Sequence, residues 1–315
     1  MKKILLSLTM AVALAASAQN GSVTYFRVQF ADNLKNMHYI DGKTFFNPDR
    51  DYIDFKGSLP FTNGSTSGNV DAFSYYYIGN TPTDKTIFLL NQSDGSPAIK
   101  KVWAYTQPVE NITMQRSEQK SFTQYEGDLK GYTYTFNALP RNIEELKTLE
   151  VNNREYFDDP FFVMALTVCC LNRVADNSAD GWEMLNYLRT HTATVGQNGV
   201  SLVSNHEMQE IVNSNLVGND QNGFPRVNGL RSYFEGALPT NFYTPTTPYR
   251  ISVMETPYSR LEENGIQYID LYVASGGADS PVGPIRLRQT NNHGWLLWSE
   301  IMGLTQSKKA QKEDL

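Results

Sequence analysis

The last third of the chain alternates apolar and polar residues in short runs. Ile251 and Val253 share one parity, and Ile269, Leu271 and Val273 repeat the pattern further along. A period of two places such apolar residues on one face of a strand, and turns that contain asparagine or glycine separate the runs. We therefore predict four antiparallel strands connected as a meander, over residues 250–256, 267–275, 284–290 and 294–300.

A helical period precedes these strands. Leu146 and Leu149 lie three residues apart on one helical face, and Asn142 is placed to cap the N-terminus of that helix. Pro160 suits the first turn of a second, strongly apolar helix. Helices followed by a strand meander are typical of an α+β domain. The predicted helices cover residues 143–150, residues 161–175, a segment beginning at residue 178, and about residues 204–215.

The N-terminal half has the composition of strands throughout. Residues 23–30 are rich in β-branched and aromatic side chains, and residues 132–136 alternate aromatic residues with threonine. A turn sequence at residues 93–97 lies between two strand-like runs and predicts a hairpin. The predicted fold class is therefore α+β, with an N-terminal antiparallel β domain over residues 19–137. A domain of three or four helices and a four-stranded antiparallel meander follows over residues 138–315.

The first 18 residues have the pattern of a secretory signal peptide. Lys2 and Lys3 form a basic start, an apolar stretch follows, and small residues precede Gln19. The stretch is too short to span a membrane as a helix, which needs about 20 residues. We therefore predict cleavage after Ala18 and a periplasmic or secreted protein. No later segment is apolar enough to predict an integral membrane segment.

The net charge bears on the class of binding partner, and the position of the two cysteines bears on their redox state. Removal of Lys2 and Lys3 lowers the basic count from 27 to 25 against 33 acidic residues, so the formal charge of the mature chain is −8. An acidic chain without a basic stripe is a poor candidate for binding nucleic acid. Cys169 and Cys170 are adjacent in the most apolar predicted helix, and we expect both to be reduced and buried.

The sequence carries no recognisable catalytic or cofactor motif. None of its four histidines has a second histidine or cysteine at the spacing of metal ligands. A nucleophile elbow, a phosphate-binding loop and a dinucleotide-binding glycine motif are also missing from the sequence. The sequence therefore predicts no catalytic residue, no metal site and no cofactor.

The least regular segment, residues 229–249, combines prolines with many aromatic residues. It enters the first predicted strand of the meander, and residues 276–281 leave the second, so both should lie at one end of the sheet. Rings and polar groups at such an edge suit a small polar ligand, a glycan or a protein, but the same rings can simply pack against their own domain. The candidate ligand-binding residues are Arg231, Tyr233, Glu235, Tyr243, Tyr249, Asp279 and Ser280.

Three phrases in this region carry a family resemblance. They are RSYFEGALPTNFYTPTTPY at residues 231–249, YVASGGADSPVGPIRLRQ at residues 272–289 and GWLLW at residues 294–298. The chain resembles an uncharacterised bacterial domain-of-unknown-function family that is frequent in gut anaerobes. The resemblance implies a fold unit from about Leu139 to the end of the chain. It implies no activity, so no functional residue is carried over from it.

Two functions of different classes follow from these observations. The first is a non-catalytic exported bacterial protein that binds a ligand or a partner, because the sequence offers no nucleophile, metal set or phosphate loop. The second is a hydrolase acting on glycans or the cell wall through a pair of carboxylates, drawn from Glu235, Asp270 and Asp279. Such a pair leaves no local motif, because its members can be distant in the sequence.

Overall fold

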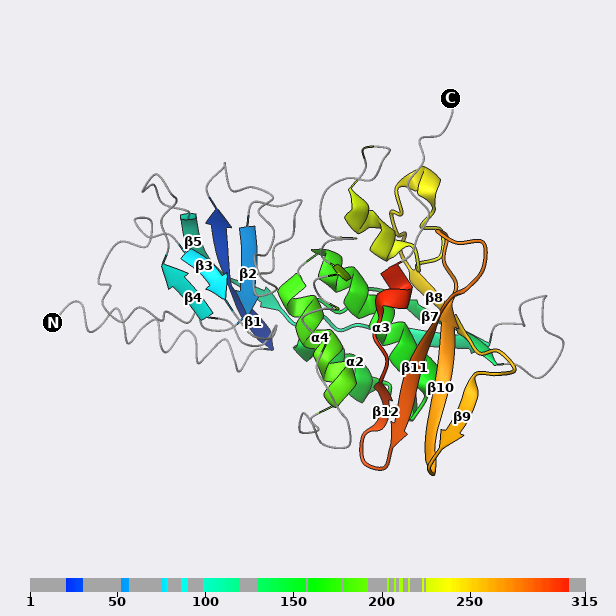
Figure 1. The fold of residues 1–315 in the computed structure, drawn as a ribbon. Helices are drawn as coiled ribbons and strands as arrows, with labels where there is room; N and C mark the ends of the chain where they lie inside the picture. Colours follow the sequence, from blue (N-terminus) through cyan, green and yellow to red (C-terminus); the bar gives the residue numbers. More distant parts are fainter. Residues whose placement is uncertain are drawn as a thin grey trace.

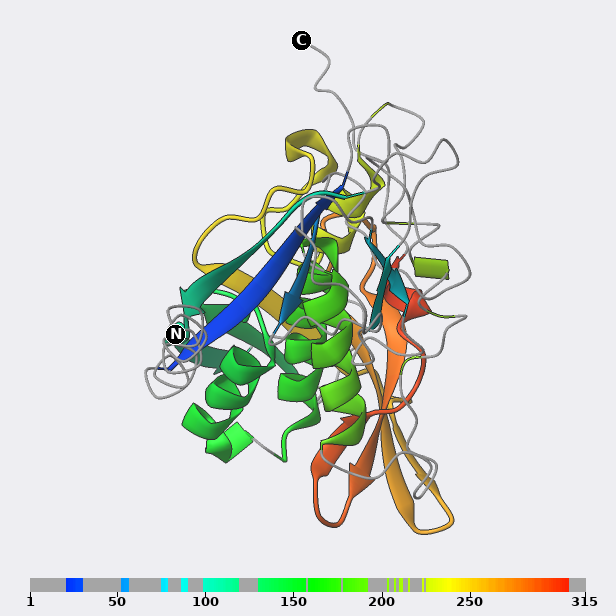
Figure 2. The ribbon, with the colours of Figure 1, turned by 90° about the vertical axis from the view of Figure 1, so that its left-hand side faces the viewer.

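The structure is a computed structural model of the 315-residue chain (Figures 1 and 2). It describes residues 21–30, 52–56, 75–78, 86–89, 99–118, 130–191 without 157 and 177, and 223–305 without 224, together with residues 203, 207, 210, 211 and 215. The predicted signal peptide and its cleavage site lie outside the described residues.

The predicted meander is confirmed as part of a seven-stranded antiparallel sheet. The strand order is β12-β11-β10-β8-β7-β6, and β9 pairs with β10 beside this path. Within the meander, the structure has one further strand that was not predicted, β9. It pairs with β10 through a tight turn at Asn264 and Gly265, both of which have positive φ. The strands are β6 (Met114–Glu118), β7 (Gly131–Phe136), β8 (Tyr249–Met254), β9 (Arg260–Glu263), β10 (Ile266–Val273), β11 (Val282–Thr290) and β12 (Gly294–Leu297).

This sheet crosses the boundary predicted at residue 138. β7 pairs with β8 over six positions, from Gly131 opposite Met254 to Phe136 opposite Tyr249, and β6 pairs with β7. Alternating side chains identified β7 as a strand, but its partner lies more than 100 residues later in the sequence. The sheet that carries the meander therefore begins with residues 114–118 and 131–136, which were predicted to belong to the N-terminal domain.

Helices α3 and α4 lie against one face of the sheet, and α2 packs against α4 (Figure 1). The predicted cap at Asn142 is confirmed, because its side chain accepts a hydrogen bond from the Glu145 backbone N–H at 3.0 Å. α3 packs against β7, β8, β10 and β12, and α4 packs against α3. The fourth predicted helix, at residues 204–215, falls largely outside the described residues. The helices are α2 (Ile143–Asn152), α3 (Pro160–Asp176) and α4 (Ser178–Thr190), with short 3₁₀ turns η3 (Arg154–Tyr156), η6 (Arg226–Arg231), η7 (Pro239–Asn241) and η8 (Met302–Thr305).

The core lies between α3 and the inner face of the sheet. Nearly every residue of α3 is buried, including Cys169 and Cys170, which are free thiols as predicted. Burial raises the pKa of both thiols above the usual range, because the anionic form would lose its hydration. Within the described part of the chain, no helix combines the length and the apolar character needed to cross a membrane.

The N-terminal strands that the structure describes form two antiparallel sheets. β1 (Ser22–Phe30) lies between β2 (Tyr52–Lys56) and β5 (Ile99–Pro108), and β3 (Tyr75–Ile78) pairs with β4 (Thr86–Leu89). The hairpin predicted across residues 93–97 is therefore wrong, because β4 pairs with β3 and β5 pairs with β1. Both flanking runs are strands, but neither is the other's neighbour.

Candidate functional site

The predicted contact between the irregular segment and the turn after β10 is confirmed. The backbone N–H of Gly276 donates to the Ser232 carbonyl at 2.8 Å, and the Ser275 hydroxyl donates to the Ser232 hydroxyl at 3.0 Å. Ser275 in turn accepts from the Gly277 backbone N–H at 3.0 Å. We call residues 231–249 and 275–281 the rim. The rim lies at the end of the sheet where β8 begins and β10 ends.

The three tyrosines predicted as ligand-binding residues face the protein. Tyr233 and Tyr243 are buried, and the Tyr233 hydroxyl donates to the Leu304 carbonyl. Tyr249 is half-buried and meets the Phe234 ring edge-on, with ring centroids 5.8 Å apart. These rings therefore seal the end of the sheet over the core, as in the packing alternative.

The four polar residues predicted for the site divide into two groups. Arg231 is held inside the domain, because its guanidinium donates to Asp176 at 2.8 Å and to Asn228 at 2.9 Å. Glu235 is at the surface, where its carboxylate lies 3.6 Å from the Arg250 guanidinium. Asp279 and Ser280 are exposed on the turn. The structure thus leaves Glu235, Asp279 and Ser280 at the surface of the rim.

The rim also exposes two apolar side chains that the sequence analysis did not select. Leu238 is 45% exposed and Phe242 is 37% exposed. The Asn241 side chain holds their loop in shape, accepting from the Leu238 N–H at 2.9 Å and donating to the Gly236 carbonyl at 2.7 Å. Leu238 and Phe242 are thus presented by a loop whose backbone is fixed by hydrogen bonds.

Two residues of this loop have a backbone conformation that is unfavourable for residues other than glycine. Phe242 and Tyr243 have φ values of 56° and 53°, in the left-handed region. For residues other than glycine such a conformation costs on the order of 1–3 kcal/mol each, and it persists only where the surroundings enforce it. The sequence contains no signal for this, because a glycine would normally mark such positions.

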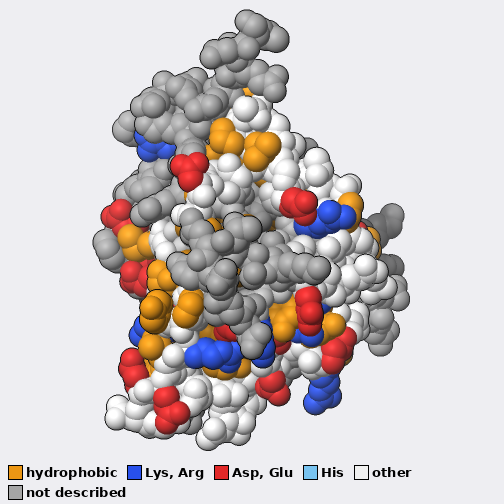
Figure 3. All heavy atoms as spheres, turned by 90° about the vertical axis from the view of Figure 1, so that its right-hand side faces the viewer, with side chains coloured by type: hydrophobic (Ala, Val, Ile, Leu, Met, Phe, Trp, Pro, Cys, Tyr) orange, Lys and Arg blue, Asp and Glu red, His pale blue; other side chains and the backbone are white. Residues whose placement is uncertain are grey.

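On the face of the molecule drawn in Figure 3, acidic, basic and apolar side chains are interspersed.

Residues 138–311 match a family described as a domain of unknown function, DUF6935. This match spans more than half of the chain. The chain belongs to this family. No similar curated protein and no similar solved structure was found. The DUF6935 match begins just after β7, so the two strands that extend its sheet, β6 and β7, lie outside the matched residues.

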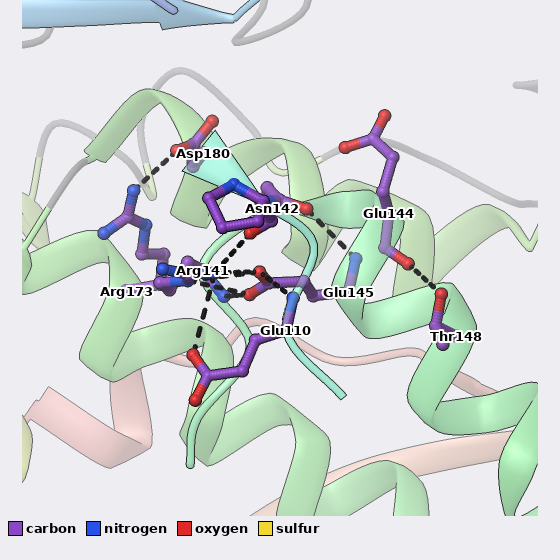
Figure 4. A network of polar contacts seen from close by, with 9 residues as sticks. Glu110, Arg141, Asn142, Glu144, Glu145, Thr148, Arg173 and Asp180 are labelled. Carbon is purple, nitrogen blue, oxygen red and sulfur yellow. Dashed lines mark hydrogen bonds and ion pairs between the residues drawn. The ribbon is translucent and has the colours of Figure 1, made fainter. Parts of the chain in front are cut away.

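A polar network ties the start of the DUF6935 domain to the N-terminal strands (Figure 4). The Arg141 guanidinium donates to the Pro108 carbonyl at 2.8 Å, and the Glu110 backbone N–H donates to the Glu145 carboxylate at 3.0 Å. Glu145 is fully buried and also accepts from the backbone N–H and the guanidinium of Arg141. A buried carboxylate satisfied by so many donors is a structural anchor, and here it fixes the end of β5 to α2.

A second cluster of titratable groups lies inside the DUF6935 domain. Glu150, near the end of α2, and His191, directly after α4, are 7% and 4% exposed, and their Oε1 and Nε2 atoms lie 3.4 Å apart. Buried titratable groups in contact are a mark of functional sites, although structural pairs also occur. The pair was not predictable from the sequence, because no local spacing links the two residues. Among the described residues no group of histidine, cysteine or acidic side chains is arranged to hold a metal ion.

Proposed function

We propose that this is an exported bacterial protein without catalytic activity, which binds a partner protein through its rim. The observation that carries the proposal is the pair of exposed apolar side chains, Leu238 and Phe242, on a strained and hydrogen-bonded loop. Of the ligand classes that the sequence leaves open, a protein with an apolar side chain suits this surface best. Glycans and small polar ligands need polar groups that converge on them.

The fixed backbone of the loop supports binding for an energetic reason. Association costs free energy when side chains and loops become ordered in the complex. A loop that is already held by Asn241 avoids part of this cost, because the backbone positions of Leu238 and Phe242 are set beforehand. Aromatic anchors of this kind contribute most of the binding energy at many interfaces.

The polar residues around the loop supply the edge of such an interface. Glu235 and Arg250 are 62% and 50% exposed, and Asp279 and Ser280 are also at the surface. Interfaces typically have an apolar centre and a polar, solvent-accessible border. The rim thus combines both parts on neighbouring segments.

Two of the candidate carboxylates of the hydrolase alternative have arginine partners. Asp270, one of its three candidate carboxylates, accepts hydrogen bonds on both oxygens from the Arg286 guanidinium, at 2.8 and 2.9 Å. Glu235 lies beside Arg250. Both carboxylates are thus paired with arginines of the sheet.

The rim is tested by removing the Phe242 ring. Asparagine is a suitable replacement because it tolerates the left-handed backbone. Peptides selected from a displayed random library on the mature protein serve as probes, and their affinity is measured for each variant. We expect Phe242→Asn to lose about 2 kcal/mol of binding energy, or roughly thirtyfold in affinity, as an interface anchor does.

Tyr258→Ser is the matched control for this experiment. Tyr258 is 83% exposed but lies in the turn between β8 and β9, outside the rim. Peptide affinity should be unchanged in Tyr258→Ser, and the melting temperatures of both variants should remain close to that of the wild type. Equal peptide binding by Phe242→Asn and the wild type, or selective binding on a glycan array, would contradict the proposal.

Export has its own test. The basic start, the apolar stretch and the small residues before Gln19 support removal of residues 1–18. Mass spectrometry of protein recovered from the periplasm or the medium should therefore find Gln19 at the N-terminus. Recovered protein that retains Lys2 and Lys3 would rule out cleavage at this site.

A further inference from the structure

Glu150 and His191 meet where two helices of the DUF6935 domain end. α2 carries Glu150 two residues before its last residue, and α4 ends one residue before His191. The His191 backbone has a φ of 39°, and its N–H donates to the Tyr187 carbonyl at 2.7 Å. Its ring stacks on the Tyr187 ring, with centroids 4.8 Å apart and planes 19° from parallel. The His191 imidazole is therefore held by backbone and ring contacts against the Glu150 carboxyl group.

Every element around this pair contributes a titratable group. The Lys147 ammonium, on α2, lies 5.1 Å from the centroid of the Tyr187 ring. Tyr187, on α4, is hydrogen-bonded to Glu150 through its hydroxyl. The charge of Glu150 acts on Cys170, which lies on α3. His293, in the turn between β11 and β12, interacts electrostatically with His191. The charge of Lys147 acts on Glu150 and favours its ionised form.

Burial favours the neutral form of both partners. It raises the pKa of Glu150 to about 7, although the hydrogen bond from Tyr187 and the charge of Lys147 act against this shift. It lowers the pKa of His191 to about 4, and the charge of the neighbouring His293 lowers it further, although a hydrogen bond with the His293 backbone acts against this shift. An ionised group inside a protein loses its hydration, so the uncharged form is preferred unless a strong partner compensates.

We propose that Glu150 and His191 hold a single proton between them and form a neutral, pH-sensitive latch that joins the ends of α2 and α4. In this state the Glu150 carboxyl group carries the proton and lies against the unprotonated Nε2 atom of His191, 3.4 Å from it. Acid adds a proton to His191 and base removes the proton from Glu150. Either change leaves one buried charge at the junction, which weakens the latch.

The two groups have opposite effects on the pH dependence of stability. The pKa of Glu150 is raised from 4.5 to about 7. Its contribution to the free energy of unfolding is therefore fully present at low pH and is lost as the pH rises through this range. The pKa of His191 is lowered from 6.5 to about 4, so its contribution is complete at high pH and is lost as the pH falls. Between pH 4.5 and 6.5 the unfolded pair is Glu⁻ with His⁺ and the folded pair is neutral, so both states bind one proton. In the wild type the two effects therefore cancel across this interval.

Single replacements should expose each effect separately. Melting temperatures are measured from pH 4.5 to 6.5 and compared with those of the wild type at each pH. In Glu150→Gln the remaining His191 should make the melting temperature rise with pH relative to the wild type. In His191→Asn, which keeps a residue that tolerates a positive φ, the remaining Glu150 should make it fall. Glu118→Gln, at an exposed position on β6, is the control and should follow the wild-type profile.

A second measurement does not depend on how well the variants fold. The ¹³C or ¹⁵N chemical shifts of the His191 ring in the folded wild type report its protonation directly. We expect a neutral imidazole at pH 5.5, where an exposed histidine is mostly charged. A charged His191 at this pH would show an ion pair in place of the neutral latch. Parallel pH profiles of the two single variants would also overturn the proposal.

Discussion

Arg189→Ala is expected to lower the free energy of unfolding by about 4 kcal/mol, the cost of leaving one member of a buried ion pair without its partner. The Arg189 guanidinium, 4% exposed, donates to both oxygens of the fully buried Glu207 carboxylate at 2.9 and 3.0 Å. It also donates to the Ser299 carbonyl at 3.1 Å. Glu207 accepts in addition from the Ile301 backbone N–H at 2.7 Å. The pair thus joins α4 to the segment that follows β12.

Removal of both charges should cost less than removal of one. In the double variant Arg189→Met, Glu207→Leu no buried charge remains, and such replacements can be close to neutral. The double variant should nevertheless remain less stable than the wild type, because the Ser299 carbonyl and the Ile301 N–H each lose a hydrogen-bond partner. A double-mutant cycle by urea denaturation measures this coupling.

Arg250→Ala is the matched control, because Arg250 and Glu235 form an ion pair in which both side chains are at least half exposed. Exposed pairs contribute about 0–1 kcal/mol, so this variant should unfold close to the wild type. If Arg189→Ala unfolds at the same urea concentration as Arg250→Ala, the Arg189 pair does not carry the stability that its burial implies.

The sequence predicted those features of the fold that depend on neighbouring residues. A period of two identified β8, β10, β11 and β12, and the turns between them were visible as asparagine and glycine residues. Asn142 was recognised as a cap because a cap acts within one helical turn. The burial of α3 followed from an apolar composition on nearly every face. In each case the physical cause lies within a few residues.

Pairing over long distances was not predictable in the same way. Nothing in β7 identifies β8 as its neighbour, so the boundary at residue 138 was drawn through the middle of a sheet. The hairpin across residues 93–97 failed for the same reason, because a turn sequence does not fix which strands meet. The shape of a sheet is decided by tertiary packing, and the strand pattern alone is compatible with several orders.

The candidate site shows both outcomes. Its position at one end of the sheet followed from topology, since antiparallel pairing with Val253 opposite Val273 carries the start of β8 past the end of β10, toward the turn that follows. The direction of each ring did not follow, and Tyr233 and Tyr243 turn inward whereas Phe242 turns outward. Phe242 and Tyr243 have a left-handed backbone and lie outside any regular element, so no strand or helix period could predict which ring faces the core.

Gly276→Ala is expected to lower the free energy of unfolding by about 3 kcal/mol, as overpacking against a backbone does. A Cβ atom at this position would lie 2.0 Å from the Ala237 carbonyl oxygen and 3.0 Å from its carbonyl carbon. Both are backbone atoms, so no rotation of a side chain can relieve the clash. The Gly276 N–H must also stay close to the Ser232 carbonyl, which accepts from it at 2.8 Å. The turn and the loop would therefore have to separate.

Gly303→Ala is the control for this change. A Cβ at Gly303 would meet Ile285 and Pro284 at 3.6 and 3.8 Å, which are ordinary contacts. Its stability should stay within about 1 kcal/mol of the wild type. Urea denaturation distinguishes the two variants, and equal stability would show that the loop and the turn are not pressed together.

Because Leu238 follows Ala237 directly, separation at Gly276 should also displace the exposed side chains of the rim. Gly276→Ala should therefore weaken peptide binding, although residue 276 itself need not touch the peptide.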